Sequence, residues 1–424
     1  MFALAAIAVL SLAAPTAANA EAQLLIEAAT GKVLHAENAT YPWYPASVTK
    51  LMTTYTTLRS IKEGRVGMNT LLTVSRNAAA MPPTHMGFKV GTTVTLDNAL
   101  KMLLVKSAND MAVVIAEGVG GSISGFADMM NANARRLGMT QSNFVNPNGL
   151  PAENHVTSAR DLGILARALI TEFPDYDYLW HIHSIRYGNR IMHNYNSLLD
   201  RYPGADGMKT GFICASGYNV VASATRNGRR LIAIVLGAWS GAARSQKAAQ
   251  LLERGFSSGG LGWLTPSLGT VDALAPIDAQ PPNLREEMCG GHRRKPPSED
   301  NNEEEEEPTT AAASGSEAGD SASASASPQA FMLSNLKPAN GKFVLGPAVE
   351  TEPPIVVFTG PADHPDAVQN ASAPSKKRHK KAVAAKTDNP DVAAEPTPEK
   401  KPAKKSAKKT AKPTAKPKVT SAEQ

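Results

Sequence analysis

A serine and a lysine have the spacing that serine acyl-transfer chemistry requires. Ser47 and Lys50 form a Ser-x-x-Lys pattern at the beginning of an apolar helical stretch, and side chains with this spacing lie on one face of a helix. The lysine amine can then take the proton of the serine hydroxyl, provided that burial and a neighbouring cation such as Lys209 keep the amine uncharged for part of the time. Taken alone, the pattern also fits a solvated helix face.

Two further polar motifs follow in the chain and make the first one more specific. Ser107 and Asn109 form a Ser-x-Asn pattern between two apolar helical stretches, and a Lys-Thr-Gly triplet begins at Lys209 on a predicted strand. We expect Ser107 to pass a proton to the leaving amine and Asn109 to hold the substrate amide. Lys209 and Thr210 would bind an anionic carboxylate, and Gly211 would let an extended peptide approach the strand edge.

The three motifs together predict an acyl transfer in two steps. An extended peptide along the strand edge would bring its scissile carbonyl to Ser47, where backbone donors of Ser47 and of a strand residue stabilise the oxyanion. The acyl group would form on the serine and then pass to water. Each motif alone also fits a surface helix, a polar loop or an edge strand, and it is their occurrence in this order that favours an enzyme.

The elements that must position these motifs are strands at both ends of an apolar region and helices between them. Thr30 with Gly31 suits the turn of one hairpin, and Asn227 with Gly228 suits the turn of another. We therefore expect an α+β fold, an antiparallel sheet flanked by helices with a helical subdomain, rather than a doubly wound parallel sheet. The predicted strands cover 23–26, 32–35, 207–213, 218–223 and 230–237. The predicted helices cover 46–63, 96–105 and 111–117. Ser107 and Asn109 fall on a predicted loop between two of these helices.

Composition divides the remainder of the chain into parts. The 44 basic and 38 acidic residues leave a net charge of +6, and much of the positive excess lies near the C-terminus. Residues 21–260 have the periodic apolar stretches of one globular domain, whereas 261–375 is a low-complexity linker that we expect to be largely disordered. Within it, 354–359 is an apolar patch that suits a short strand, a partner-binding motif or an unremarkable apolar stretch of a linker. The Lys/Ala/Pro-rich tail, 376–424, is predicted to be disordered and to attract anionic wall or membrane surfaces.

Residues 1–20 have the features of a secretory signal peptide. The apolar stretch ends in Ala18, Asn19 and Ala20, which fits cleavage near Ala20 and predicts export to the periplasm. No later segment approaches the roughly 20 apolar residues that a transmembrane helix needs, so we expect none in the mature chain. The signal, together with the lack of aromatic or groove-reading elements in the basic tail, argues against a nucleic-acid partner.

The chain has two cysteines, Cys214 and Cys289. They are too few for a disulfide scaffold or a multi-cysteine zinc site. They can pair with each other in an oxidising compartment, or remain two separate thiols of which Cys214 is buried beside a strand. We assign neither of them a catalytic role.

Over about 22–256 the chain resembles the low-molecular-mass penicillin-binding proteins, specifically the serine-type D-alanyl-D-alanine carboxypeptidases. The resemblance rests on the three motifs and on 28–31, 45–53, 144–150 and 157–161. It implies the fold shared by penicillin-binding proteins and serine β-lactamases, removal of the terminal D-alanine from peptidoglycan pentapeptide stems, covalent inhibition by β-lactams, and no metal or organic cofactor. The residues that match its functional positions are Ser47 (the acylated serine), Lys50 (its proton acceptor), Ser107 and Asn109 (the second motif) and Lys209 (the substrate-binding lysine).

Two other polar residues have less specific signals. Arg244 lies where the resemblance suggests a second contact to the substrate carboxylate, although one arginine after a strand also fits a solvated surface charge. His155 follows the Asn-Pro-Asn-Gly stretch. We expect it to be a hydrogen-bonded structural histidine, because serine–lysine chemistry does not require it.

Other functions use the same first motif. A class A β-lactamase would need a Glu-x-x-Leu-Asn stretch between Asn109 and Lys209, which the sequence lacks. A D,D-endopeptidase that cleaves peptidoglycan cross-links would use the same machinery and stays open as an alternative. A non-catalytic wall-binding protein is the alternative outside the enzymes, and it would not need every polar residue of the three motifs.

Overall fold

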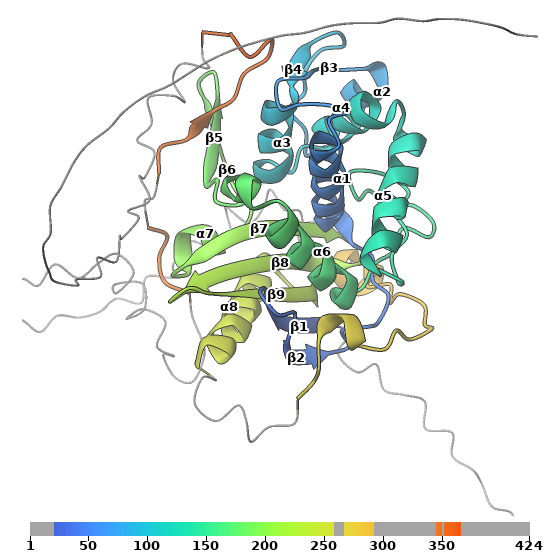
Figure 1. Ribbon diagram of the computed structural model, residues 1–424, viewed down its shortest axis with the longest axis vertical. Helices are drawn as coiled ribbons and strands as arrows, with labels where there is room; N and C mark the ends of the chain where they lie inside the picture. The colour runs from blue at the N-terminus through green and yellow to red at the C-terminus, as the bar shows by residue number, and fades with distance from the viewer. Residues whose placement is uncertain (1–20, 258–266, 292–344, 350–351, 366–424) are drawn as a thin grey trace, which may run out of the picture. The chain divides into compact units, whose positions relative to one another are not determined.

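The structure is a computed structural model that describes residues 21–257, 267–291, 345–349 and 352–365 (Figure 1). All of these residues fall in the first of the two units into which the chain divides, Met1–Ala373. The predicted signal peptide and the predicted basic tail lie outside the described residues.

A five-stranded antiparallel sheet with the order β2-β1-β9-β8-β7 carries the third motif. Asn227 and Gly228 connect β8 to β9 with φ of 51° and 77°, the left-handed conformations that a two-residue hairpin turn needs. β7 lies at the edge of the sheet, where Lys209 stands opposite Val221 of β8. Both predicted hairpins and the antiparallel sheet are confirmed. The strands are β1 (Ala22–Glu27), β2 (Val33–Glu37), β7 (Ala205–Ile213), β8 (Gly217–Arg226) and β9 (Arg229–Ala238).

The two faces of this sheet pack against different helices. Successive side chains of a strand point to opposite faces, so Leu24 and Ile26 of β1 enter one hydrophobic cluster and Leu25 enters the other. The first cluster includes α6 (Ala159–Glu172) and the helices beyond it, and the second includes α8 (Gly241–Ser257). Figure 1 shows α6 and α8 on opposite sides of the strands. The sheet is therefore covered by helices on both faces.

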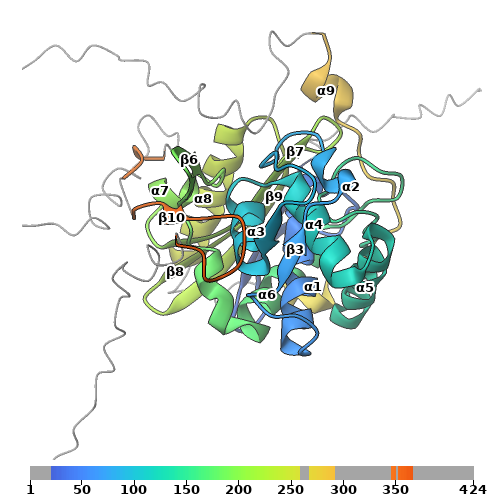
Figure 2. The same ribbon diagram turned by 90° about the horizontal axis from the view of Figure 1, so that it is seen from above.

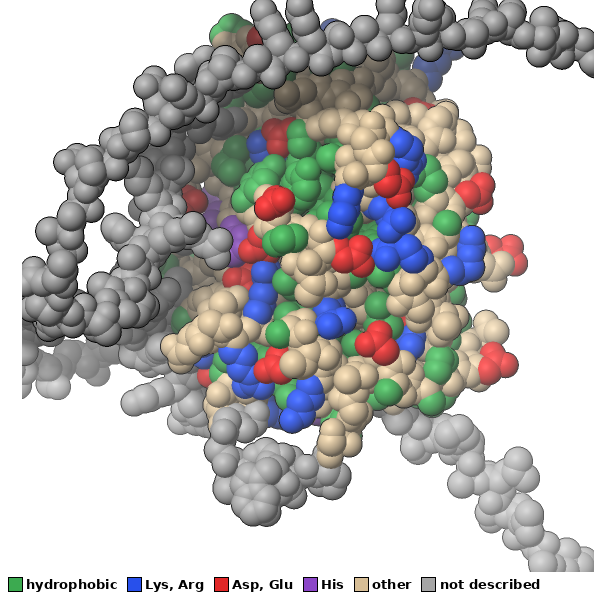
Figure 3. Space-filling model, viewed as in Figure 1, with side chains coloured by type: hydrophobic (Ala, Val, Ile, Leu, Met, Phe, Trp, Pro, Cys, Tyr) green, Lys and Arg blue, Asp and Glu red, His purple; other side chains and the backbone are tan. Residues whose placement is uncertain are grey.

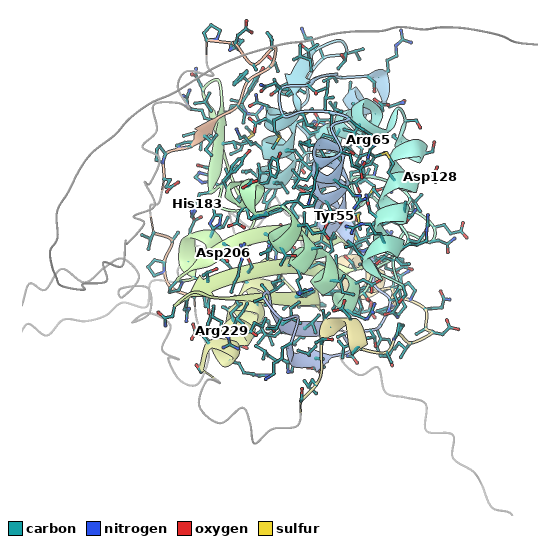
Figure 4. The ribbon with its side chains drawn as sticks, viewed as in Figure 1. Tyr55, Arg65, Asp128, His183, Asp206 and Arg229 are labelled. Atoms are coloured by element: carbon teal, nitrogen blue, oxygen red, sulfur yellow. A yellow bond between two sulfur atoms is a disulfide. The ribbon has the colours of Figure 1, made fainter. Side chains whose placement is uncertain are left out.

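α1 (Lys50–Lys62) is the central helix of the helical region and carries the first motif. Every side chain from Lys50 to Leu58 is buried, and the helix contacts α3, α4, α5 and α6. The hydroxyl of Tyr55 donates a 2.9 Å hydrogen bond to Glu172 at the end of α6 (Figure 4). The other elements here are η1 (Ala46–Thr49), α2 (Arg76–Ala79), α3 (Leu96–Val105), α4 (Asn109–Gly120), α5 (Ile123–Leu137), η2 (Pro174–Leu179), α7 (Leu198–Arg201) and the strand pairs β3 (Leu71–Thr73) with β4 (Thr93–Thr95) and β5 (Ser184–Tyr187) with β6 (Arg190–His193).

The beginning of the edge strand β7 is fixed by a buried carboxylate. Asp206 lies 2.9 Å from the Nε of Arg230 on β9 and accepts a 2.8 Å hydrogen bond from Thr225 Oγ1 on β8 (Figure 4). Arg230 also pairs with Asp177 of η2 at 2.6 Å. These contacts link the strand that carries Lys209 to its neighbour β8 and to β9, the next strand of the sheet.

Short segments within the predicted linker, 261–375, have regular structure. Val271, in η3 (Val271–Ala273), is buried in the main core, and β10 (Ile355–Val356) pairs in parallel with β5. Cys214 and Cys289 form a disulfide that joins α9 (Arg285–Cys289) to the end of β7. Figure 2 shows α9 at the margin of the domain. Of the two alternatives for the cysteines, the structure has the paired one. The sequence does not predict that these segments are folded, because each is short and is separated from the core by Pro-rich chain.

In the described part of the chain, no helix by itself has the length and apolar character to cross a membrane; α4 and α5 meet these criteria only as a pair bent by 82°. On the face shown in Figure 3, basic and acidic side chains alternate rather than forming a single basic patch.

Candidate active site

Ser47 and Lys50 lie where η1 passes into α1, and the lysine contacts three oxygens. The Lys50 Nζ lies 3.0 Å from Ser47 Oγ, 2.9 Å from Asn109 Oδ1 and 2.7 Å from the carbonyl oxygen of Asn148. Lys50 is fully buried. The structure thus brings the first motif and the Asn109 of the second motif together, and it adds a backbone carbonyl to which the sequence analysis assigned no role.

A glycine allows the Asn148 carbonyl to approach the lysine. Gly149 has a φ of +84°, and a Cβ at this position would lie 1.9 Å from the carbonyl oxygen of Ala46 in η1. The same loop is held from α1, because Thr53 Oγ1 donates a 2.6 Å hydrogen bond to the Pro147 carbonyl. The Asn-Pro-Asn-Gly stretch therefore packs its backbone directly against the segment that carries Ser47.

A second glycine brings the edge strand to the serine. A Cβ on Gly211 of β7 would lie 2.7 Å from the backbone nitrogen of Ser47 and 2.9 Å from that of Val48. Contacts this short with backbone atoms require one element to move, so only glycine fits here. The sequence analysis predicted that Gly211 lets a peptide approach the strand edge; in the structure the segment that lies close to this glycine is η1 of the same chain.

The second motif spans the end of α3 and the beginning of α4. Ser107 has a φ of 59° and a buried hydroxyl that has no hydrogen-bond partner among the described residues. Asn109 is the first residue of α4, so its predicted place on a loop is wrong; Ala108, at the N-cap, makes no side-chain capping hydrogen bond and gives no start signal. The Asn109 Nδ2 donates a 3.0 Å hydrogen bond to the Pro82 carbonyl, which together with Lys50 fixes the orientation of the amide.

The third motif places a buried cation and a buried hydroxyl on β7. The Lys209 Nζ donates a 2.9 Å hydrogen bond to the Thr210 carbonyl, and both side chains are buried. The Thr210 Oγ1 has no hydrogen-bond partner among the described residues. Because Gly211 follows directly and its backbone lies close to that of Ser47, the strand places the third motif beside the segment that carries the serine.

Arg244 is buried, so the alternative interpretation of this residue as a solvated surface charge is wrong. It lies in the first turn of α8, where its guanidinium lies 3.3 Å from the Tyr195 carbonyl and 5.7 Å from the ring centre of Tyr218. The carbonyl of Asn219 on β8 lies 3.5 Å from the same group. This Asn219 is a residue that the sequence analysis missed: its side-chain amide donates to the Pro45 carbonyl at 3.2 Å, just before the Ser47 segment. The only sign of this role in the sequence is that Asn219 is a polar residue inside a largely apolar predicted strand.

His155 has the structural role that we expected. Burial lowers the pKa of His155 from 6.5 to about 4, so the ring is neutral near pH 7. Its Nδ1 accepts a 3.0 Å hydrogen bond from the Val145 N–H, which leaves the proton on Nε2, 2.9 Å from Thr49 Oγ1. The histidine therefore links the Asn-Pro-Asn-Gly loop to η1 through Thr49, which lies between Ser47 and Lys50 in the first motif.

Comparison with protein families gives one match that covers more than half of the chain. A family model described as D-alanyl-D-alanine carboxypeptidase matches residues 9–240, which include all three motifs but neither Arg244 nor α9. D-alanyl-D-alanine carboxypeptidase DacD of Salmonella typhimurium is 36% identical over 260 residues, covering 60% of this chain and 67% of that protein. DacF of Bacillus subtilis is 35% identical over 246 residues, covering 56% of this chain and 62% of that protein. The chain thus spans about two thirds or less of the length of these relatives.

Solved structures of similar proteins have the same fold. The D-alanyl-D-alanine carboxypeptidase DacD of Francisella tularensis matches with a TM-score of 0.55 and 29% identity over 60% of this chain and 74% of that one. Penicillin-binding protein 6B of Escherichia coli matches with a TM-score of 0.54 and 35% identity over 57% of this chain and 79% of that one. These matches confirm the predicted α+β fold. The chain belongs to the D-alanyl-D-alanine carboxypeptidases, the serine-type peptidases among the low-molecular-mass penicillin-binding proteins.

Proposed function

We propose that the chain removes the terminal D-alanine from peptidoglycan pentapeptide stems through an acyl-enzyme on Ser47. The observation that carries the proposal is the 3.0 Å contact between Lys50 Nζ and Ser47 Oγ in a buried position. The names of the curated relatives support the substrate, since each is a D-alanyl-D-alanine carboxypeptidase.

Lys50 acts as the base because its other contacts orient the amine. When the amine is neutral it has two N–H bonds and one lone pair. The two N–H bonds are directed to Asn109 Oδ1 and to the Asn148 carbonyl, at 2.9 and 2.7 Å. The lone pair is then left for the hydroxyl of Ser47, which is the geometry that proton removal requires.

The reaction proceeds in two transfers of the acyl group. Ser47 Oγ attacks the carbonyl of the penultimate D-alanine while Lys50 takes the hydroxyl proton. Ser107 relays a proton to the amine of the terminal D-alanine, the C–N bond breaks, and free D-alanine leaves with the stem acylated on Ser47. Water then attacks the ester, a proton returns to Ser47, and the shortened stem leaves. Backbone N–H groups of Ser47 and β7 stabilise the oxyanion in both steps.

The terminal carboxylate of the substrate binds at the third motif. Thr210 offers a buried hydroxyl with no described partner, and Lys209 provides the positive charge beside it. A hydrogen bond to a charged carboxylate is roughly twice as strong as one between neutral groups, which selects peptides that end at this position. Arg244, buried behind β8, supplies a second positive charge to the same region.

Inhibition by β-lactams and location at the cell wall belong to the same proposal. Penicillin-binding protein D2 of Listeria monocytogenes, solved in an ampicillin-bound form, matches with a TM-score of 0.52 and 28% identity over 56% of this chain and 98% of that one. We expect β-lactams to acylate Ser47 in the same way. Export through the segment 1–20, and binding of the tail 376–424 to anionic wall or membrane surfaces, complete the proposal.

The test is product analysis with purified muropeptides. The wild-type chain should release free D-alanine from an uncross-linked pentapeptide, and Ser47→Ala should release none. Cleavage of cross-linked muropeptides without release of D-alanine from the pentapeptide would favour the endopeptidase instead. If neither substrate is cleaved and labelled penicillin forms no adduct, the chain is a non-catalytic binding protein and the proposal is wrong.

A further inference from the structure

A pocket of about 460 Å³ lies between the loop that precedes β4 and the β5–β6 strand pair. Its lining comes from within 85–92, from within 187–192 and from Thr359. None of the described residues that line it belongs to β7 or to the three motifs. The volume falls within the range of about 300–1,000 Å³ that ligand pockets occupy. The pocket is therefore a second place, apart from the active site, where a ligand can bind.

Hydrogen bonds and a ring contact hold the first two walls of this pocket in place. The N–H groups of Met86 and Gly87 each donate a 3.0 Å hydrogen bond to the buried carboxylate of Asp110 in α4. The ring of Phe88 packs edge-on against that of Tyr187 on β5, with 5.2 Å between the ring centres. The loop is thus fixed both to α4 and to the opposite wall.

The third wall comes from a segment far along the chain, and hydrogen bonds lie on both sides of Thr359. The Val357 N–H donates a 2.9 Å hydrogen bond to the Arg186 carbonyl, and the Gly360 N–H donates a 2.7 Å hydrogen bond to the Thr93 carbonyl. This segment lies outside the part of the chain that the family model matches. The pocket is therefore completed by this chain's own C-terminal region.

Two basic side chains line the pocket, one on each of two walls. Lys89 lies on the loop and Arg190 on β6, and both are exposed. Among the described residues no acidic side chain lines the pocket, and within the same residues neither Lys89 nor Arg190 forms an ion pair. Because the lining has no counter-charge of its own, the pocket attracts an anionic ligand.

The remaining lining suits an acidic peptide better than a single phosphate group. It has apolar side chains, such as Met192, and hydrogen-bonding ones, such as Thr92. A phosphate is commonly held by a set of free backbone N–H groups, whereas the N–H groups of Met86 and Gly87 are bonded to Asp110. An acidic peptide matches the lining, because its carboxylates can pair with the two cations while the rest of it contacts the apolar and hydroxyl groups.

Peptidoglycan is a polymer that presents many acidic stem peptides close together. We propose that the pocket binds the free carboxylates of one stem while a neighbouring stem of the same polymer reacts at Ser47. Two attachments to one polymer hold the chain at the wall more firmly than either does alone, because the second binding occurs at a high effective concentration. The inference rests on the function proposed above for the identity of the polymer, and it adds a binding site that the reaction itself does not use.

Binding to insoluble peptidoglycan, measured by co-sedimentation, tests the pocket without turnover. In chains that carry Ser47→Ala, the added pair Lys89→Ala with Arg190→Ala should raise the Kd by about threefold to tenfold, because exposed charge contacts contribute roughly this much. When the carboxylates of the peptidoglycan have been amidated, the two chains should bind equally. The matched control is Lys32→Ala with Arg135→Ala, which removes a lysine and an arginine from exposed positions outside the pocket and should leave the Kd unchanged.

The same substitutions with an intact Ser47 separate the pocket from the active site. Lys89→Ala with Arg190→Ala should release D-alanine from insoluble, pentapeptide-containing peptidoglycan with a kcat/KM about threefold to tenfold below that of the wild type. On a soluble acetylated tripeptide that ends in D-Ala-D-Ala, which is too short to reach the pocket and the serine at once, the two proteins should have equal kcat/KM.

The inference is wrong if the pocket variant binds peptidoglycan as its parent does, if the control loses as much, or if the loss persists on amidated peptidoglycan. A loss of binding to phosphatidylglycerol vesicles with none to peptidoglycan would assign the pocket to a phosphate headgroup and would also overturn it. Release of no D-alanine from the soluble tripeptide would contradict the proposed function, whereas the binding comparison, made in Ser47→Ala, would still decide this inference.

Discussion

The backbone carbonyl of Asn148 and the amine of Lys50 are 2.7 Å apart, although the two residues are far apart in the sequence. Their contact means that the base of the proposed reaction is positioned by a loop backbone and not only by its own helix. The loop can come this close because Gly149 packs against the Ala46 carbonyl. The geometry of Lys50 therefore depends on a residue that has no side chain.

Gly149→Ala should displace the loop and weaken the enzyme. The added Cβ would lie 1.9 Å from the Ala46 carbonyl, and the φ of +84° is strained for alanine. We expect a loss of more than about 2 kcal/mol in the free energy of unfolding, and acylation by labelled penicillin slower by at least about tenfold. Gly91→Ala is the control, since Gly91 has a φ of +87° but nothing within 4 Å of the new Cβ. A similar loss in both variants would show that strain, not contact with η1, is the cause.

Gly211→Ala should affect acylation more than folding. Its Cβ would lie 2.7 Å from the Ser47 nitrogen, so β7 must move away from the serine or the serine must turn. A displacement of about 1 Å in an active site can slow the reaction by about 100-fold. Stopped-flow acylation with a chromogenic β-lactam measures it, with Gly67→Ala as a control because nothing lies within 4 Å of that Cβ. Acylation within twofold of the wild type would mean that this contact does not position the serine.

Buried His155 should make the domain less stable in mild acid. Its pKa falls from 6.5 to about 4 on folding, so the unfolded chain takes up this proton first as the pH falls. The contribution of the neutral ring to the free energy of unfolding is fully present above about pH 6.5. It decreases by about 3 kcal/mol in total as the pH falls towards 4. Urea unfolding at several pH values should show this slope in the wild type, and His155→Gln, which cannot titrate, should show a shallower one. Parallel slopes in both proteins would be inconsistent with a neutral, buried ring.

The sequence predicts those features of the fold and site that depend on local patterns. The hairpin at Asn227 and Gly228 follows from residues that favour left-handed conformations, and the Ser47–Lys50 contact follows from helical spacing. The order of the three motifs was enough to predict that Asn109 belongs to the same site. The first two of these rest on residue types within a few positions of one another, and the third rests on three such short motifs in a fixed order along the chain.

Contacts that arise only from tertiary packing could not be predicted. The Asn148 carbonyl is a backbone group, so no residue type identifies it as a partner of Lys50. The burial of Arg244 depends on how α8 packs on the sheet, and a single arginine in a sequence gives no sign of it. The position of α9 depends on one disulfide and one buried methionine, Met288, within a Pro-rich segment whose composition is typical of disorder.

Removal of the disulfide should release α9 and leave the sheet intact. The bond closes a sequence separation of 75 residues, and bonds of this kind contribute about 2–4 kcal/mol. In the double variant Cys214→Ser with Cys289→Ser, the amides of 284–289 should exchange with solvent at least about 30-fold faster, while those of β9 keep their protection. Reduction of the wild type should reproduce the result. Unchanged exchange in 284–289 would mean that the buried Met288 and the hydrogen bond from the Leu284 N–H to the Ala215 carbonyl hold α9 without the disulfide.

The most direct test of the central claim is the rate and the site of acylation by penicillin, measured by mass spectrometry of intact and digested protein. In the wild type we expect a single adduct on the peptide that contains Ser47, and in Ser47→Ala we expect none. In Lys50→Met, with folding checked by circular dichroism, the same adduct should form about 100-fold to 10,000-fold more slowly, because the base is lost. An adduct on another residue, or acylation of Lys50→Met at the wild-type rate, would contradict the account.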